Sequence, residues 1–284
     1  MDGPFRTETP SKLEYESMAA LGPLLLNGDL KAIAKLNDLC NEYGLDTIET
    51  GTTIAFILEC YEKRIVSKQD IGMELAWGNS EAMIELLEMI CRKKGFGAIL
   101  SEGVRKSAEI IGKGATEFAM HVKGSSICMH DPRTPFKPGI GLKYVVGNTG
   151  AYHGLGDARA SSNEGPYELA RAVVEAQNWA EIVESLVMCS FTFDSWALAL
   201  PYTYIVDLVS AVTGQEVDEK KLLEIGDRLY NMKHAFNLKL GIGKKDDTLP
   251  ERFMKVPRIL QDGTTRIANI EASLKAYYDI RGWT

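Results

Sequence analysis

Apolar residues recur at helical spacing along most of this chain, and this periodicity limits its possible folds more than any other feature. Within the segment 27–43, Ile33, Leu36 and Cys40 fall on one helical face, and Gly44 follows directly. A glycine just after a periodic segment is typical of a helix C-cap, because glycine adopts the left-handed conformation without strain. The spacing therefore predicts a helix over 27–43.

Similar patterns predict further helices and very little sheet. The sequence Asp46-Thr47-Ile48-Glu49 has the form of a capping box and predicts a second helix that runs to about Ile65. The other predicted helices span 80–94, 99–111, 167–188, 196–212, 218–240 and 268–280. The best strand signal is a short run from Lys143 to Val146. We therefore expect a mainly α, multihelical fold.

A shift in composition divides the chain. It begins near Gly112, and from Gly124 to Pro166 the sequence is rich in Gly, Pro, Ser and Asp, with few apolar residues. A loop of this length in a compact protein is more often a functional element than a simple connection. We expect two helical domains, 1–115 and 116–284, with the long loop in the second.

Charge and hydropathy exclude several classes of function. The chain has 32 basic and 39 acidic residues, a net charge of −7, so it lacks the basic surface expected of a nucleic-acid-binding protein. No apolar run approaches the ~20 residues that a membrane span needs. The first residues also lack the pattern of a secretory signal. These features predict a cytoplasmic protein.

The five cysteines are sparse and widely separated. No CxxC pair occurs, which excludes a zinc ribbon, a thioredoxin-type site and a four-thiolate cluster held by one local loop. An odd, scattered set suits a reducing compartment. Cys40, Cys60 and Cys91 lie in apolar periodic stretches, which predicts small buried side chains. Cys128 and Cys189 lie outside these stretches.

Common catalytic motifs are absent, including the Walker A, HExxH and G-x-S-x-G patterns. Gly154-Leu155-Gly156 begins like a dinucleotide fingerprint, but no strand leads into it and no third glycine follows at the required spacing. Four other segments carry residues that could perform chemistry. They are Glu14–Glu16, Asn41–Asp46, the loop that holds His130 and His153, and Glu184–Phe191.

Each of these segments has a structural and a functional interpretation. The turn Asn41–Asp46 either caps a helix or offers amides and a helix dipole to an anionic or hydrogen-bonding ligand. A loop histidine near neutrality either transfers a proton or holds the loop by hydrogen bonds. Cys189, where a helix is predicted to end, either packs or binds a metal as a thiolate. The carboxylates of Glu14 and Glu16 either cap the first helix or take part in a site.

Several separated motifs, taken in order, resemble one family. They are Glu14-Tyr15-Glu16, Gly44 to Ile48, His130-Asp131-Pro132-Arg133, Asn148 to His153, Ser185 to Cys189, Phe236-Asn237, Asp246 to Phe253, and Tyr277 to Trp283. This ordered set resembles the C-terminal two-thirds, domains 2 and 3, of the tungsten-containing aldehyde ferredoxin oxidoreductases. The likeness runs from about Glu14 to Thr284.

The resemblance implies a tungsten-bispyranopterin (tungstopterin) cofactor beside a 4Fe-4S cluster. Members of the family bind the pterins with two turns of the pattern Asp-x-x-Gly-Leu-(Asp/Cys). By this resemblance, the cofactor-binding residues of the two turns are Asn41, Gly44, Leu45 and Asp46, and Glu184, Met188 and Cys189. Cys189 would also ligate the cluster.

The resemblance also implies an activity, the oxidation of small aldehydes to carboxylic acids with electron transfer to ferredoxin. Glu16 and His153 match the glutamate and histidine that handle protons beside the tungsten, and we expect them to be catalytic. The chemistry is consistent with this role, because aldehyde oxidation with water releases protons that a nearby base must accept. The cofactor carries out the redox step and the protein orients the reactants.

The sequence also departs from the family pattern. Asn41 and Glu184 replace aspartates, Tyr152 replaces a frequent cysteine, and the stretch between His153 and Cys189 is shorter than usual. The N-terminal pterin-binding domain and the CxxCxxxC group of cluster cysteines are not in this sequence. We therefore expect the chain to be inactive alone and to require the missing N-terminal domain or a partner subunit.

Two alternatives remain open at this stage. The chain could be a non-catalytic helical module that has lost its cofactors, which the absent cysteines and the residues Asn41 and Glu184 suggest. It could also belong with relatives that reduce carboxylic acids or aromatic thioesters, which the shortened stretch after His153 suggests.

Overall fold

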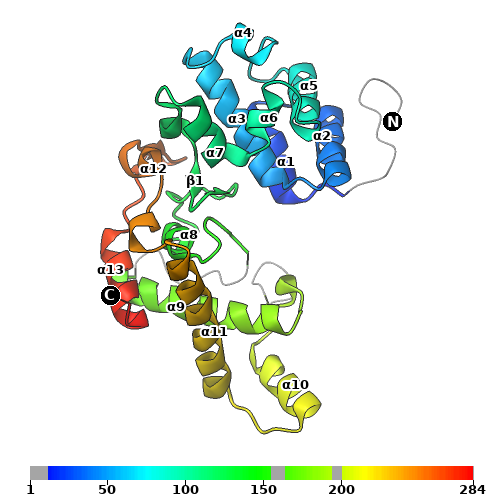
Figure 1. Cartoon of the computed structure of the whole chain (residues 1–284). Coiled ribbons are helices and arrows are strands. Elements are labelled where there is room, and N and C mark those ends of the chain that lie inside the picture. Colours follow the sequence, from blue (N-terminus) through cyan, green and yellow to red (C-terminus); the bar gives the residue numbers. More distant parts are fainter. Residues whose placement is uncertain (1–11, 155–163, 194–199, 284) are drawn as a thin grey trace. The chain divides into compact units, whose positions relative to one another are not determined.

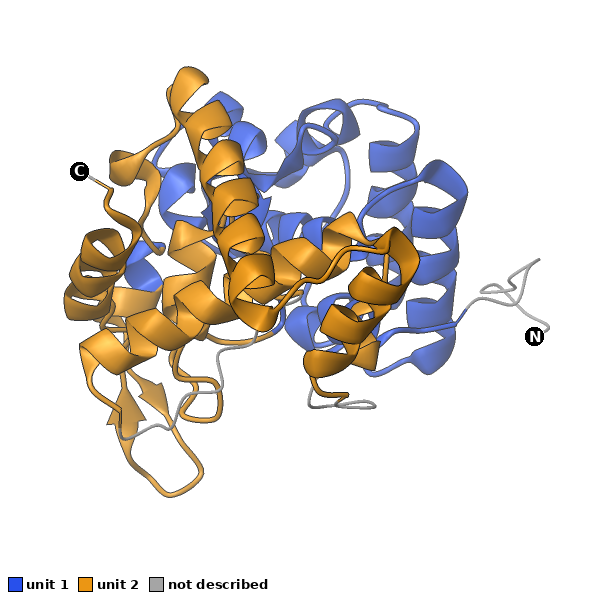
Figure 2. Cartoon of the chain, turned by 90° about the horizontal axis from the view of Figure 1, so that it is seen from below, with its two compact units in different colours: residues 1–129, 250–252 blue, residues 130–249, 253–284 orange. Residues whose placement is uncertain are grey.

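The computed structural model describes residues 12–154, 164–193 and 200–283, and its elements are mainly α-helices (Figure 1). The chain forms two compact units, coloured separately in Figure 2. Unit 1 contains residues 1–129 and 250–252, and unit 2 contains residues 130–249 and 253–284. The expected mainly α, multihelical fold is confirmed. Residue 115, the predicted domain boundary, lies within unit 1.

Unit 1 is a helical bundle with a short β-hairpin. Its elements are α1 (Tyr15–Leu21), η1 (Pro23–Leu25), α2 (Leu30–Tyr43), α3 (Thr47–Glu62), α4 (Lys68–Ile71), α5 (Ser80–Cys91), α6 (Gly97–Leu100), α7 (Gly103–Ile111), η2 (Ala115–Phe118), β1 (His121–Val122) and β2 (Ser125–Ser126). Helix α3 packs against α1, α2, α5 and α7. Leu36, Ile54 and Leu86 are fully buried in the core between these helices.

Local signals set the ends of the first long helices as the sequence predicts. Asp29 caps α2 by accepting a hydrogen bond from the Lys31 amide at 2.9 Å, and Gly44 ends it with φ +67°. Asp46 caps α3 by accepting from the Glu49 amide at 2.7 Å. The predicted helices at 27–43 and after Asp46 are thus confirmed.

A capping box has two hydrogen bonds, and the one predicted from the Asp46 amide to the Glu49 carboxylate is wrong. The Glu49 carboxylate accepts hydrogen bonds from the Val104 amide at 2.7 Å and the Ser126 amide at 3.1 Å. These amides belong to α7 and strand β2, so the side chain joins three elements instead of closing its own helix. Sequence alone predicted the local partner because the tertiary partners lie 55 and 77 residues away.

The predicted helix 80–94 is confirmed as α5, but 99–111 is two helices. Gly97 begins α6, and Gly103, with φ +83°, separates α6 from α7. A Cβ atom at Gly97 would overlap the main chain of Met89 on α5. Gly97 therefore permits a close approach of α6 to α5.

Unit 2 is built around a long central helix. Its elements are α8 (Ile140–Val146), α9 (Pro166–Ser185), η3 (Ser190–Thr192), α10 (Thr203–Thr213), α11 (Glu219–Lys239), η4 (Lys244–Asp246), α12 (Glu251–Lys255, whose first two residues belong to unit 1), β3 (Arg258–Ile259), β4 (Thr265–Arg266) and α13 (Glu271–Arg281). Helix α9 packs against α11 and α13. The buried Arg281 guanidinium bonds to Asn178 at 2.8 Å and Asp227 at 2.6 Å and so ties these three helices together.

The strand predicted from Lys143 to Val146 is wrong, because these residues belong to helix α8. Every residue of α8 is buried. A helix satisfies its own backbone hydrogen bonds, whereas an isolated buried strand would need a neighbour. The strands in the described part of the chain are the two-residue pairs β1–β2 and β3–β4, both antiparallel.

The other predicted helices of unit 2 are confirmed with shifted ends. They correspond to α9, α11 and α13. The helix predicted over 196–212 is α10, which begins at Thr203, two residues after Pro201. Residues 194–199, including the predicted start at Trp196, lie outside the described residues, as do Leu155 and Gly156.

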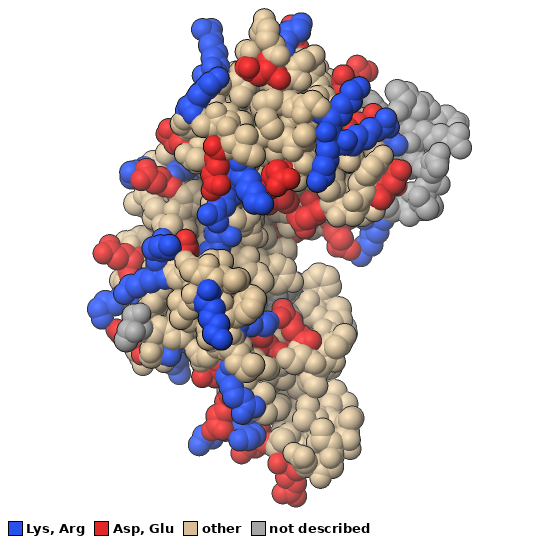
Figure 3. Space-filling view, viewed as in Figure 1, with Lys and Arg blue, Asp and Glu red and all other residues tan. Residues whose placement is uncertain are grey.

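Two findings bear on the excluded functions. Acidic and basic side chains are interspersed over the face shown in Figure 3. No helix in residues 12–154, 164–193 and 200–283 is long and apolar enough to cross a membrane.

Candidate functional site

The turn at Asn41–Asp46 connects helices α2 and α3 of unit 1. Gly44 adopts φ +67°, and the Leu45 amide donates to the Cys40 carbonyl at 2.8 Å. Asp46 has φ −67° and ψ +128° and begins α3. All six residues are exposed except Leu45, which is half-buried.

The turn at Glu184–Cys189 lies at the C-terminal end of α9 in unit 2. Val187 adopts φ +56°, and the Met188 amide donates to the Val183 carbonyl at 3.1 Å. Cys189 has φ −68° and ψ +124° and begins η3. All six residues are exposed except Met188, which is half-buried.

The two turns therefore share one backbone geometry and one pattern of exposure. Gly44 corresponds to Val187 at the left-handed position, and Asp46 corresponds to Cys189 at the start of the next helix. The sequence pattern aligned these turns, and the main-chain angles agree at both positions.

Glu16 lies in the first turn of α1 and is 9% exposed. Its Oε2 accepts a hydrogen bond from the Met129 amide at 2.8 Å. A carboxylate oxygen of Glu16 and the buried Sγ of Cys128 lie within 4.8 Å of each other. The main chain at 128–129 thus brings a carboxylate and a thiol together inside unit 1.

Close packing of α1 against α3 fixes the position of Glu16. A Cβ atom at Gly51 would overlap the carbonyl oxygen of Ala20, so glycine allows the two helices to approach. Beside Glu16, the Ser17 and Thr47 hydroxyls share a hydrogen bond of 2.8 Å. Ser17 directly follows Glu16, and Thr47 directly follows Asp46. This hydrogen bond therefore links the start of α1 to the first turn.

His153 lies in unit 2, at the end of a loop that follows α8. The Lys143 ammonium donates hydrogen bonds to the carbonyls of His153, at 2.9 Å, and Gly154. The ring centroids of His153 and His130 are 5.2 Å apart, and Tyr152 lies 6.0 Å from His153 on the same measure. The structure thus places the two histidines of the long loop next to each other.

A cavity of about 110 Å³ lies within unit 2. Its lining joins the loop 147–152 to the end of α9 and to α11, and includes Lys143, Asn148, Glu181, Glu184 and Lys233. The second turn and the loop 147–152, which are separate in sequence, therefore meet at one cavity with charged residues in its lining.

Three of the charged residues that line this cavity form ion pairs with one another. Lys233 forms ion pairs with Glu181 at 2.6 Å and Glu184 at 3.3 Å. Burial raises the pKa of Glu181, and the Lys233 ammonium opposes that shift. Burial lowers the Lys233 pKa, but the hydrogen bonds and charges of Glu181 and Glu184 together outweigh burial, so the pKa is raised.

The cysteines differ in their surroundings. Cys40 and Cys60 are fully buried, which confirms the prediction, and burial raises their pKa values to about 11 and about 12. Cys91 is half-buried, and burial raises its pKa as well. Cys189 is exposed. Of the five thiols, that of Cys189 is the one presented to solvent.

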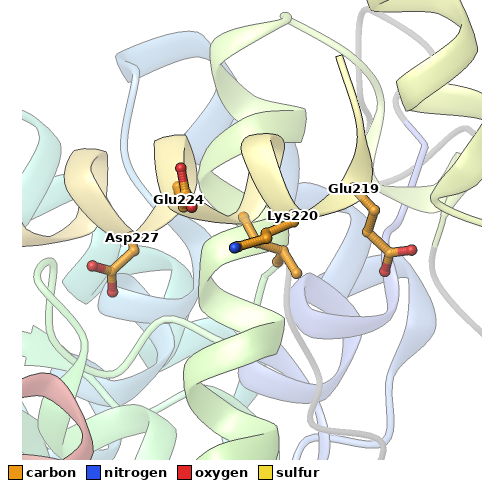
Figure 4. A pocket seen from close by; sticks show the side chains of 5 residues that line it. Glu219, Lys220, Glu224 and Asp227 are labelled. Atoms are coloured by element: carbon orange, nitrogen blue, oxygen red, sulfur yellow. The ribbon is translucent and has the colours of Figure 1, made fainter.

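Two further hollows lie away from the predicted residues. A shallow groove of about 570 Å³ follows α11, where Figure 4 shows the side chains of Glu219, Lys220, Glu224 and Asp227. A second hollow of about 280 Å³ lies beside the stacked rings of Trp179 and Tyr202. None of the predicted site residues lines either one.

Sequence reasoning did not single out Cys128, Lys143 or the pair Glu181 and Lys233. Cys128 belongs to no motif, and its approach to Glu16 depends on the tertiary fold. Lys143 had a usable signal, because it is a charged residue inside an otherwise uncharged seven-residue run that is rich in apolar side chains. Glu181 and Lys233 lie on different helices, so no local spacing connects them.

Relatives resemble the chain over nearly its whole length. It is 34% identical to the tungsten-containing aldehyde ferredoxin oxidoreductase of Pyrococcus furiosus, over 98% of the chain and 46% of the relative. It is 30% identical to the WOR-like subunit of an aliphatic sulfonate oxidoreductase from the same organism, over 99% and 45%. The chain thus spans about half the length of the curated relatives it matches.

A solved structure has the same fold. The active-site complex BamBC of benzoyl coenzyme A reductase, with 1,5-dienoyl-CoA, superposes with a TM-score of 0.74 at 19% identity, covering 96% of this chain and 46% of the other. The family described as aldehyde ferredoxin oxidoreductase, domains 2 and 3, matches residues 2–284. The chain therefore belongs to the aldehyde ferredoxin oxidoreductase family and corresponds to its domains 2 and 3.

Proposed function

We propose that this chain is the domain 2 and 3 part of a tungsten-pterin enzyme that oxidises aldehydes to carboxylic acids and passes electrons to ferredoxin. One observation supports this most strongly. The turns at Asn41–Asp46 and Glu184–Cys189 have matching geometry, and the second presents an exposed thiol. Each turn offers groups that suit one pterin of the cofactor.

The residues of the turns fit part of a pterin site. Most residues of both turns are exposed, among them Asn41, Asp46 and Glu184. Pterin rings offer several donors and acceptors, which such groups can match. Asn41 keeps an acceptor oxygen without the charge, and Glu184 keeps the charge on a longer side chain. When bound, the tungsten-pterin group would supply the two-electron redox chemistry.

The cysteines of this chain do not by themselves fit a 4Fe-4S cluster. Such a cluster takes four thiolate ligands. Cys189 is exposed, whereas Cys40 and Cys60 are buried in unit 1 and are kept protonated by their raised pKa values. We infer that Cys189 contributes one ligand and that the others come from outside this stretch of sequence.

Glu16 and His153 are the proposed proton carriers. Oxidation of an aldehyde with water to a carboxylic acid releases two electrons and two protons. The Met129 amide holds Oε2 of Glu16, and this carboxylate is proposed to receive a proton. The His153 imidazole can accept a proton near neutral pH. Each group is positioned by hydrogen bonds within its own unit.

The test is the metal content of the protein purified anaerobically from its source with any tightly bound partner retained. We expect tungsten and iron to copurify with the chain, and Cys189→Ser to remove the iron-sulfur signal in electron paramagnetic resonance. Cys91→Ser, which changes a half-buried thiol of unit 1, is the matched control. An absence of both metals, or an unchanged signal in Cys189→Ser, would contradict the proposal and favour a non-catalytic helical module.

The substrate class is tested by assay of the same preparation. The relatives include proteins named for aldehydes and for aliphatic sulfonates, and the structural neighbour is named for benzoyl coenzyme A. Aldehyde oxidation is the expected activity. Turnover of a sulfonate, a carboxylic acid or an aromatic thioester without aldehyde oxidation would contradict the proposed substrate. The proposed cofactor would be unaffected.

A further inference from the structure

A lysine is buried in the middle of helix α8. Lys143 is 6% exposed, and every other residue of this helix is buried too. Burying an ammonium group is strongly unfavourable unless hydrogen bonds compensate. The Lys143 Nζ atom donates to two consecutive carbonyls, those of His153 and Gly154. The buried charge is thus directed at the residue proposed to carry protons.

Close packing holds helix α8, which carries Lys143, in place. Its Gly141 fits closely against neighbouring side chains, because a Cβ atom there would lie 3.3 Å from Ile270 and 3.5 Å from Pro132. The next residue after Lys143, Tyr144, donates from its hydroxyl to the His130 carbonyl at 3.1 Å. Two adjacent residues of one helix therefore hold the main chain of both neighbouring histidines.

The start of the loop that follows α8, at residues 146–148, is fixed independently by α11. The Asn148 amide group donates to the Tyr230 carbonyl at 3.2 Å, and Asn237 donates to the Asn148 carbonyl at 2.7 Å. The Tyr230 hydroxyl donates to the Val146 carbonyl at 2.9 Å. These bonds hold residues 146–148, and the Lys143 bonds hold the end at 153–154.

We propose that Lys143 is a positioning residue that sets the orientation of the His153 imidazole by clamping the two carbonyls. The side chain acts through the main chain of His153 and takes no part in bond making. This inference rests on the proposed function of His153. An uncharged residue at position 143 would pack in the helix but would remove the ammonium that holds the two carbonyls. A displacement of about 1 Å in a group that transfers a proton costs roughly 100-fold in rate.

The first test measures the imidazole directly in the full chain. Four histidines are present, so isotope-labelled histidine gives four sets of ring signals in a nuclear magnetic resonance spectrum, each assignable by a single substitution. We expect Lys143→Gln to move the His153 signal toward that of the unfolded chain and to leave His121 and His234 unchanged. Lys143→Arg, which keeps two donors, should restore the wild-type position.

Lys275→Met is the matched control, because it removes a surface lysine of unit 2 that pairs with Asp279. Unchanged His121 and His234 signals in Lys143→Gln would show that the variant is folded. If Lys143→Gln fails to fold, Lys143→Arg and Tyr144→Phe are measured instead. We expect Tyr144→Phe to move the His130 signal and to leave the His153 signal unchanged. A His153 signal that stays at its wild-type position in folded Lys143→Gln would overturn the proposal.

The second test uses the complete enzyme. Lys143→Gln should lower kcat by about 10- to 100-fold with little change in KM, and Lys143→Arg should recover most of the loss. Loss of kcat without a change in the His153 signal would mean that Lys143 acts in another way. A changed signal in a chain that binds no metal would instead leave the positioning role standing and refute the proposed function.

Discussion

At the turn Asn41–Asp46 of unit 1, a glycine takes the left-handed position and an aspartate caps a helix of 16 residues. At the turn Glu184–Cys189 of unit 2, a valine takes that position and a cysteine directly precedes a 3-10 helix of three residues. The main-chain angles nevertheless agree within a few degrees at Asp46 and Cys189. One backbone shape is therefore produced by two different sets of side chains.

The two turns differ in whether their side chains stabilise the fold or remain available for chemistry. In unit 1, Gly44 avoids strain and the Asp46 carboxylate stabilises α3 by accepting the Glu49 amide. In unit 2, Val187 is 92% exposed in a conformation that disfavours branched side chains, and Cys189 has no side-chain capping bond. The first turn contributes to folding, whereas the second tolerates strain and keeps its thiol accessible.

The largest expected contrast is in thiol reactivity. In the metal-free chain at pH 8, we expect Cys189 to react with a disulfide reagent at least about 100-fold faster than Cys40 and Cys60, because burial raises the pKa of those two thiols to about 11 and about 12. Absorbance of the released thiolate measures the rates. Cys189→Ser should remove the fast phase, and a fast phase that survives this change would contradict the assignment.

Gly44→Val would impose the residue of the second turn on the first. No atom lies within 4 Å of a Cβ placed at Gly44, so the cost is conformational strain alone. We expect the free energy of unfolding to fall by about 1–2 kcal/mol, which urea denaturation would measure. A loss close to zero would show that the turn relaxes out of the left-handed conformation.

Asp46→Ala tests the capping difference. Loss of the hydrogen bond to the Glu49 amide should lower the unfolding free energy by about 1 kcal/mol. Cys189→Ala at the corresponding position should change it by less than about 0.5 kcal/mol, because the thiol is exposed and caps nothing. Thermal unfolding of both variants measures the comparison, and equal losses would refute it.

Val187→Gly would impose the residue of the first turn on the second. Little buried surface is lost, and relief of strain should exceed the added flexibility of the unfolded chain, so we expect a gain of about 0.5 kcal/mol. Val212→Gly, at an exposed valine inside helix α10, is the control and should destabilise. A loss of stability in Val187→Gly would mean that the valine side chain has a role beyond the turn.

The sequence predicted what depends on neighbours along the chain. The capped helices α2 and α3 could be recognised because Asp29, Gly44 and Asp46 act within their own turns. Helix α8 could not, since its valines favour strand and its helical state depends on burial from all sides. For the site, ordered motifs indicated both turns, Glu16 and His153, whereas Cys128, Lys143 and Lys233 act across the fold.

The smallest expected effect concerns the charge beside the second turn. Glu181 is buried on α9, one turn before Glu184, and faces Lys233, Glu184 and Arg281. Because burial raises its pKa in the folded state, the folded chain binds this proton more readily than the unfolded chain. The contribution of Glu181 to stability therefore falls as the pH rises from its ordinary pKa of about 4.3 through the raised value.

Glu181→Gln removes this dependence, because glutamine does not ionise. We expect the unfolding free energy of the variant, relative to wild type, to increase as the pH rises from 4.5 to 7. Urea denaturation across this range measures it, with the exposed Glu184→Gln as the control. A difference that stays constant with pH would mean that Lys233 fully compensates the buried carboxylate.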